Sequence, residues 1–240
     1  MKKHITFLAI TIAGIGLTVF SSCHIGCIKG SGNKVTESRK ITNFSKIDIS
    51  GAFKINIKQD SSLSLSVMGD DNIMKYVRTQ VNGNKLRIYT RKDICGDGPI
   101  IVNVGVKYLE EIEGSGAIEL ASEGRINTQN LNLHFSGASK IDMDLSAADV
   151  KTEASGATEI NLKGQAASHQ VSASGVSKLH AFDFIVGNYN IKTSGSGNSE
   201  INVLKSLITH TSGASNIEYR GNPSKVEENK SGASSITKVQ

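Results

Sequence analysis

A Ser-Gly pair recurs at a nearly constant interval through the second half of the chain, and this repeat restricts the fold more than any other feature. The decapeptide SGASKIDMDL (residues 136–145) returns as SGATEINLKG (155–164), SGASNIEYRG (212–221) and SGASSITKVQ (231–240). Aligning the copies on the glycine gives steps with a mean of about 19 residues, a period that predicts a solenoid of stacked coils. The aligned glycines, with an outlying copy near the front, are Gly51, Gly116, Gly137, Gly156, Gly175, Gly197, Gly213 and Gly232.

Within each unit, apolar residues occupy every second position. Leu131, Leu133 and Phe135 lead into one Ser-Gly pair, and Ile141 and Met143 follow it. A period of two predicts a β-strand with one buried face. In this register each repeated glycine falls on the inner face, where it marks a bend, because an interior glycine in a strand often accompanies one. We therefore predict an all-β fold whose coils each add about 4.8 Å of height.

The third residue after the aligned glycine carries charges of alternating sign. In a stack, these exposed side chains would lie about 4.8 Å apart, so that opposite charges become neighbours. A slipped register would bring like charges together, so the column would also help to fix the register. Alternation by chance is the other interpretation. The predicted charge ladder consists of Glu119, Lys140, Glu159, Lys178 and Glu200.

The repeat is weaker in residues 35–110, which we expect to form the first coils and a cap. A cap is needed because an open end of a stack exposes unpaired strand edges. Together with the regular units at 111–240, this part would make a single solenoid domain, residues 35–240. The predicted elements are a strand at 63–67, a helical turn within 69–77 capped by Asp70 or Asp71, a hairpin at 81–90 around Asn82-Gly83, and a strand at 100–106.

The N-terminus carries an export signal. Two lysines precede an apolar run that is shorter than the roughly 20 residues of a membrane-spanning helix, and small residues follow it. Residues 1–22 are therefore predicted to be a signal peptide. The sequence FSSC is typical of a lipobox, although leucine is commoner than Phe20 at its place, so Cys23 is predicted to carry a lipid. The alternative is a plain signal peptide with an ordinary cysteine. Residues 23–34 would then be a flexible tether.

These features predict an exported outer-membrane lipoprotein on the periplasmic face or the cell surface. Its contact with the membrane would be the N-terminal lipid. Two other cysteines remain, Cys27 and Cys95, and an exported protein can keep a disulfide between such a pair. Two unpaired thiols are the alternative. The cysteine and histidine spacings do not match a metal site, and we expect no metal or cofactor.

Three stretches resemble one known family. They are FSKIDISGAFKINIKQ, VMGDDNIMKYVRTQVNGNKLRIYT and the serial SGAS-x-I-[DNE] units, which together span residues 35–232. The chain is similar to the putative auto-transporter adhesin head domain family, called the GIN domain. This resemblance implies a right-handed parallel β-helix in a bacterial exported or lipid-anchored protein. It transfers no functional residue.

The sequence offers little evidence of a reaction centre. Acidic residues such as Asp142 and Asp144 alternate with apolar ones, as on any solvated strand face. His134 and His210 share a repeat position but would lie four coils apart, about 19 Å, so they cannot share a metal ion. We expect a surface position for each histidine of the mature chain: His24, His134, His169, His180 and His210.

Charge and motifs together favour a binding protein. The net charge is +5, which is too mild and too dispersed to predict nucleic-acid binding. No catalytic residues are predicted. The sequence favours a non-catalytic envelope protein with an adhesin-like or ligand-binding domain, whose partner is a glycan or an envelope protein. The alternatives are a polysaccharide-active β-helix enzyme and a purely structural envelope protein.

Overall fold

The computed structural model describes residues 26–96 and 98–240, and the fold is all-β apart from one short helix. The predicted signal peptide and Cys23 lie outside the described residues. The elements in chain order are β1 (Ile28–Lys29), β2 (Lys34–Ser38), β3 (Lys46–Gln59), β4 (Ser64–Asp70), α1 (Asp71–Met74), β5 (Val77–Asn82), β6 (Lys85–Thr90), β7 (Ile94–Cys95), β8 (Ile100–Val106), β9 (Glu111–Arg220), β10 (Lys225–Gly232) and β11 (Ser235–Lys238).

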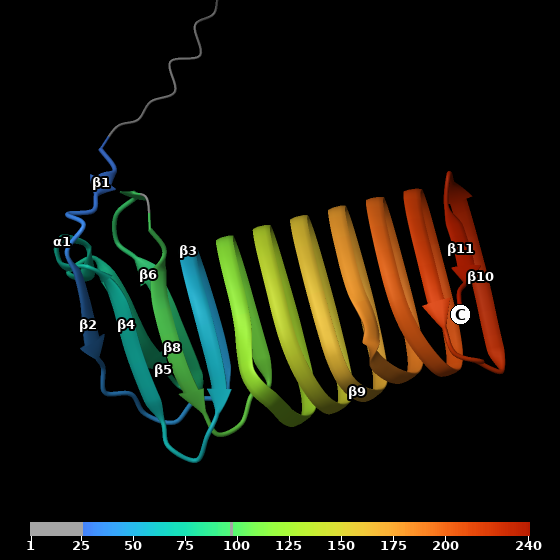
Figure 1. Ribbon diagram of the computed structural model, residues 1–240, viewed down its shortest axis with the longest axis horizontal. Helices are drawn as coiled ribbons and strands as arrows, with labels where there is room; N and C mark the ends of the chain where they lie inside the picture. The colour runs from blue at the N-terminus through green and yellow to red at the C-terminus, as the bar shows by residue number, and fades with distance from the viewer. Residues whose placement is uncertain (1–25, 97) are drawn as a thin grey trace, which may run out of the picture.

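The strand β9 winds through most of the molecule as a row of successive coils (Figure 1). Its first coil pairs in parallel with β3, with Ile47 opposite Ile112 and Gly51 opposite Gly116. Its last coil pairs in parallel with β10, where Leu207 lies opposite Val226. Neighbouring turns of the chain are therefore hydrogen-bonded side by side, and equivalent residues of the repeat stack on each other.

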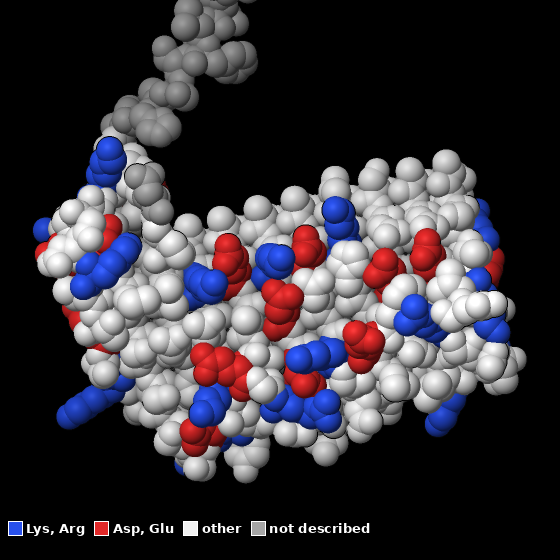
Figure 2. Space-filling model, in the orientation of Figure 1, with Lys and Arg blue, Asp and Glu red and all other residues white. Residues whose placement is uncertain are grey.

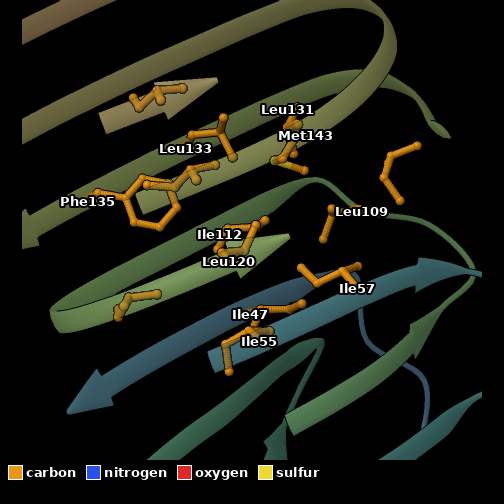
Figure 3. Close-up of a cluster of buried hydrophobic side chains, with 14 of the residues drawn as sticks. Ile47, Ile55, Ile57, Leu109, Ile112, Leu120, Leu131, Leu133, Phe135 and Met143 are labelled. Atoms are coloured by element: carbon orange, nitrogen blue, oxygen red, sulfur yellow. The ribbon is translucent and has the colours of Figure 1, made fainter. Parts of the chain in front are cut away.

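The apolar residues of the period-two pattern form the core, as the sequence predicts. Leu131, Leu133, Phe135, Ile141 and Met143 are all buried. The side chains of Leu131, Leu133, Phe135 and Met143 point into the space enclosed by the coils (Figure 3). Burial of one such side chain contributes roughly 1.5–3 kcal/mol. The core is continuous from the cap to the last coils because each coil stacks its buried residues on those of the previous one.

The repeated glycine does not face inward, which corrects the position expected for it. Ser136, Gly137 and Ala138 are three consecutive exposed residues, with buried Phe135 before them and buried Ser139 after them. Gly137 has a φ of +96°, a left-handed conformation in which a side chain is strained. The alternation is interrupted at this corner, so the glycine lies outside while the flanking strands keep their inner faces.

Antiparallel strands close the N-terminal end of the stack. β4 pairs with β8, and β2 pairs with β4 at the edge. The predicted hairpin is confirmed: β5 and β6 pair around a turn in which Gly83 has a φ of +61°. The predicted helical turn is α1, whose N-cap Asp70 makes no side-chain capping bond. No helix in residues 26–96 or 98–240 is long and apolar enough to cross a membrane.

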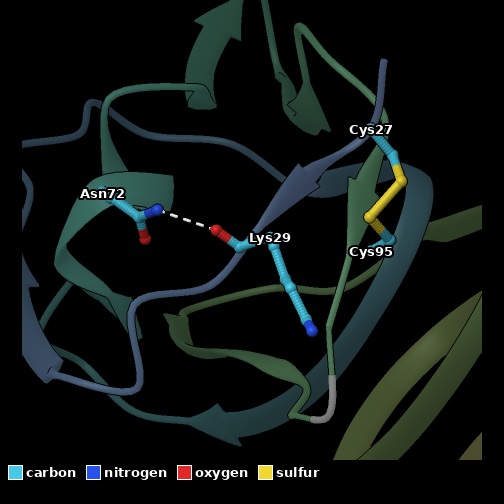
Figure 4. The surroundings of a disulfide bond; sticks show 4 residues. All are labelled: Cys27, Lys29, Asn72 and Cys95. Carbon is cyan, nitrogen blue, oxygen red and sulfur yellow. Dashed lines mark hydrogen bonds between the residues drawn. A yellow bond between two sulfur atoms is a disulfide. The ribbon is translucent and has the colours of Figure 1, made fainter. Parts of the chain in front are cut away.

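Cys27 and Cys95 are joined by a disulfide in the structure (Figure 4). The bond holds the start of the described chain against the cap, where β1 pairs with β7. The side chain of Asn72 donates a hydrogen bond to the carbonyl oxygen of Lys29 at 2.8 Å. From Cys27 onward the expected tether therefore lies on the body, because covalent and hydrogen bonds fix it there.

The last coil places charges where the core columns end. Glu228 lies opposite Thr209 and Lys230 opposite Thr211, two buried positions of the preceding coil. The Lys230 ammonium and the Glu228 carboxylate are 2.6 Å apart. Charged residues in these positions discourage the addition of another strand at the open end.

Candidate functional site

The stacked glycines make a column of bare backbone along one corner of the coils. Gly156 is representative: its φ is +93°, and a Cβ atom added to it would lie 2.5 Å from the carbonyl oxygen of Gly137. Only glycine avoids both the strained backbone and this overlap. The column runs through Gly51, Gly116, Gly137, Gly156, Gly175, Gly195, Gly213 and Gly232.

The assignment of Gly197 to this column was wrong, and Gly195 occupies the place. Gly195 has a φ of +119° and lies over Gly175, while Gly197 lies against the side chain of Ser177. Gly197 therefore takes the inward position that Ser177 and Ser215 hold in the neighbouring coils. The segment SGSGNS contains two Ser-Gly pairs, and only the first continues the stacking with nearly equal steps.

The charge ladder is present only in part. Lys140 and Glu159 form an ion pair at 3.3 Å, and Lys54, which the sequence analysis did not include, pairs with Glu119 at 3.6 Å. Lys178 makes no ion pair with the described part of the chain. Because each of these contacts is exposed to solvent, it contributes at most about 1 kcal/mol.

Glu200 does not belong to the ladder. The shift from Gly197 to Gly195 moves it two positions along its coil, where its carboxylate lies 2.8 Å from Nδ1 of His180. Asn198 occupies the ladder position in its place and accepts a hydrogen bond from the amide of Asn216 at 3.1 Å.

The residue before each column glycine is a serine, and these serines form a second column, the serine ladder. Several hydroxyls donate to a carbonyl oxygen of the preceding coil, as from Ser136 to Gly114 at 3.5 Å and from Ser212 to Thr193 at 3.4 Å. The ladder therefore helps to hold the corner closed and also presents a line of hydroxyl groups. Its members are Ser50, Ser115, Ser136, Ser155, Ser174, Ser194, Ser212 and Ser231.

An open groove follows the serine ladder along the stack, with a volume of about 1110 Å³; we call it the long groove. It reaches from Asp48 on β3 to Ser231 on β10, so it crosses every regular coil. Besides the serines, one outward column lines it, formed by the residues three positions before each glycine. These are Asp48, Glu113, His134, Glu153, Ser172, Lys192, His210 and Asn229.

The acidic groups of the long groove are already paired. Asp48 contacts Arg87 at 3.0 Å, and Glu113 contacts Lys85 at 2.8 Å. Glu153 contacts Lys151 at 2.6 Å, and this hydrogen bond together with nearby His134 lowers the pKa of its carboxyl group. Each of these carboxylates is therefore compensated by a cation in direct contact with it.

A second, smaller groove lies on the other side of the glycine column and has a volume of about 670 Å³. Ala117, Ala138 and Ala157 line it, and so do Ile94 of β7 and Pro99. Charged side chains of both signs are interspersed over the face of the stack that Figure 2 shows. The remains of the charge ladder border this second groove.

Phe182 is an aromatic side chain on the outward face, which the sequence analysis did not find. It is half-buried because the guanidinium of Arg220 lies over its ring, 4.1 Å from the centroid. The arrangement is a cation–π contact, and it leaves this face of the ring covered.

His169 is buried in the core, contrary to the surface position expected for it. Its exposed fraction is 1%, and Nε2 lies 2.9 Å from the hydroxyl of Thr152. The rings of Tyr189 and Phe184 pack around it at 5.1 and 5.7 Å between centroids. Its Nδ1 atom has no hydrogen-bond partner within the described chain. Burial lowers the pKa of the imidazole to about 3, so it is neutral at physiological pH.

The chain belongs to the family of the putative auto-transporter adhesin head GIN domain, whose sequence profile matches residues 43–223. This confirms the resemblance found in the sequence. A search of curated proteins gives no significant match. Among residues 26–96 and 98–240, no group of three or more His, Cys, Asp or Glu side chains is placed to hold a metal ion.

Solved structures share the fold at low sequence identity. A putative adhesin from Bacteroides fragilis superposes with a TM-score of 0.84 at 22% identity, covering 88% of this chain and all of that one. A putative adhesin from Parabacteroides merdae gives 0.66 at 22% identity, covering 89% and 99%. A putative lipid binding protein from Parabacteroides distasonis gives 0.63 at 22% identity, covering 90% and 100%. These structures belong to the same fold, and at this identity the similarity concerns the fold alone.

Proposed function

We propose that this protein is a non-catalytic, lipid-anchored binding protein of the cell envelope, and that its long groove holds an extended polysaccharide. The domain is a right-handed parallel β-helix, displayed from the outer membrane by a lipid on Cys23. The family's adhesin description and the FSSC sequence support this location. Protease treatment of intact cells distinguishes the cell surface from the periplasmic face.

The long groove is the observation that supports binding. It is open along its length, so a long unbranched chain can lie in it without threading an end. Each coil adds one serine and one outward residue at about 4.8 Å intervals, a spacing close to one sugar unit of an extended polysaccharide. Serine hydroxyls both donate and accept hydrogen bonds, as sugar hydroxyls do.

The same groove gives little support to a polysaccharide-cleaving enzyme. Such chemistry needs one carboxylic acid with a raised pKa beside an ionised carboxylate. In the long groove, Glu113 is paired with Lys85, and the Lys151 contact lowers the pKa of Glu153. Each of these two carboxylates is in contact with a lysine, so they do not form the pair of groups that such cleavage needs.

Filling the groove tests the proposal. The Ser155→Trp side chain would lie across the long groove, and Ala157→Trp would place the same ring on the other side of Gly156, in the second groove. We expect Ser155→Trp to weaken binding to soluble polysaccharides at least about tenfold, a loss of about 1.4 kcal/mol. Ala157→Trp should bind like the wild type. Both positions are exposed, so the free energy of unfolding should change by only about 0.5 kcal/mol.

Isothermal titration and affinity electrophoresis with a panel of neutral and acidic polysaccharides measure this effect. Equal binding by both variants would contradict the assignment of the ligand to the long groove. Loss of binding in Ala157→Trp alone would instead indicate that the ligand binds in the second groove.

A further inference from the structure

The two halves of the long groove differ in how their charges are compensated. In the half nearer the cap, each carboxylate has a cation in contact with it, as described above. In the other half, Lys192 makes no ion pair within residues 26–96 and 98–240. The register of the glycine column places Ser172 beside it on one coil and His210 on the other, and neither is an acid. Lys192 is exposed and lines the groove.

Serine hydroxyls near Lys192 make no hydrogen bonds to the protein. Ser194, two residues along the same coil, and Ser174, beside it on the neighbouring coil, line the groove, and their hydroxyls make no hydrogen bond to other described residues. Because these two hydroxyls are exposed and have no protein partner, a ligand in the groove can form hydrogen bonds with them.

This combination is suited to an anionic ligand. An ammonium, an imidazole and several free hydroxyl donors converge on one part of an open groove. Hydrogen bonds from a charged donor to a carboxylate are among the stronger polar contacts in proteins. Because the groove continues past this region over several coils, the anion would belong to a chain that extends along the stack.

We propose that the Lys192–His210 region of the long groove is a subsite for the carboxylate of an acidic, uronate-bearing polysaccharide. This inference rests on the proposed function and names the class of polysaccharide. Lys192 supplies the ammonium, His210 and the hydroxyls of Ser174 and Ser194 supply further donors, and the serine ladder holds the neutral parts of the sugar chain. The paired acids nearer the cap leave that half of the groove without free positive charge.

The test compares each acidic polysaccharide with its own neutral form. The probes are polygalacturonate and hyaluronate, each beside its methyl ester, titrated against the full-length mature chain at low and high salt. We expect at least one acidic form to bind about tenfold more tightly than its ester, and the difference to shrink as salt screens the charges. Lys192→Gln should bring the acidic form to the level of the ester.

Lys178→Gln is the matched control. Lys178 is exposed, makes no ion pair with the described residues, and lies on the opposite side of the same corner, in the second groove. Lys178→Gln removes the same charge outside the long groove, so it should leave binding unchanged. Melting temperatures of both variants show that each is folded.

The remaining outcomes separate the two proposals. Equal binding of acid and ester, unaffected by Lys192→Gln, would overturn the acidic subsite while leaving the polysaccharide groove intact. Equal losses in Lys192→Gln and Lys178→Gln would indicate unspecific attraction and would also overturn it. No binding of any probe, acidic or esterified, would count against both the subsite and the proposed function.

Discussion

Gly156→Ala is expected to lower the free energy of unfolding by about 2–5 kcal/mol. A non-glycine residue in the left-handed region costs roughly 1–2 kcal/mol, and overpacking of a well-filled structure adds about 1–3 kcal/mol. Both apply here because Gly156 has a φ of +93° and its added Cβ would lie 2.5 Å from the Gly137 carbonyl oxygen. The overlap is with backbone, which cannot rotate away, so two coils must separate. Urea denaturation followed by circular dichroism measures the change.

Gly124→Ala separates the two contributions. Gly124 also has a positive φ, +86°, but an added Cβ would meet nothing within 4 Å. We therefore expect Gly124→Ala to cost only the conformational part, about 1–2 kcal/mol. If the two variants were equally destabilised, the close stacking of the glycine column would not be the reason that this position requires glycine.

Acid is expected to destabilise the protein through His169. Its folded-state pKa of about 3 lies below the ordinary value of 6.5, so the unfolded chain binds the extra proton. The contribution of His169 to the free energy of unfolding is therefore fully present above about pH 6.5 and is lost as the pH falls toward 3. At pH 5 the loss should be about 2 kcal/mol, because each pKa unit corresponds to roughly 1.4 kcal/mol.

Other groups also titrate in this range, so the comparison uses a variant. His169→Leu removes the titrating group from a buried column that also holds Val150, Tyr189 and Leu207, and Thr152→Val is added so that no buried hydroxyl is left unpaired. Between pH 7 and pH 5, the wild type should lose about 2 kcal/mol more than this double variant. His210→Gln, at an exposed histidine, should behave like the wild type. An equal loss in the wild type and the double variant would show that His169 is not held neutral by burial.

The sequence repeat predicted the stacked coils because it combines two independent patterns, a constant interval and a period-two alternation of apolar residues. The interval of about 19 residues sets the coil, and the alternation through Leu131, Leu133 and Phe135 sets which side chains face inward. The hairpin at Gly83 and the strand Ile100–Val106 also followed from local patterns. The antiparallel pairing of β2 with β4 did not, since it depends on which edges the folded stack leaves open.

The errors arose where a local motif was given more weight than the register. Gly197 follows a serine as the column glycines do, but Gly195 is the glycine that stacks on Gly175, and it keeps the steps between column glycines nearly equal. Counting inward positions back from Gly175 also places His169 inside. The period-two register therefore indicated burial of His169, whereas its residue type alone favoured an exposed position.

The long groove could not be predicted from the sequence, although its parts were visible there. A serine precedes every column glycine, but the sequence does not reveal that the corner turns these serines outward. The positive φ of the glycines produces that exposure, and it is a property of the stacked backbone. Likewise, the absence of an acidic neighbour for Lys192 depends on which residues the register brings beside it.

Binding without turnover is the central claim, and one experiment measures both. The full-length mature chain is titrated with soluble polysaccharides, and the same mixtures are sampled over many hours for new reducing ends. The account predicts saturable binding to an extended polysaccharide, with no increase in reducing ends over a protein-free control. New reducing ends that accumulate in proportion to protein, or no binding to any polysaccharide, would contradict it.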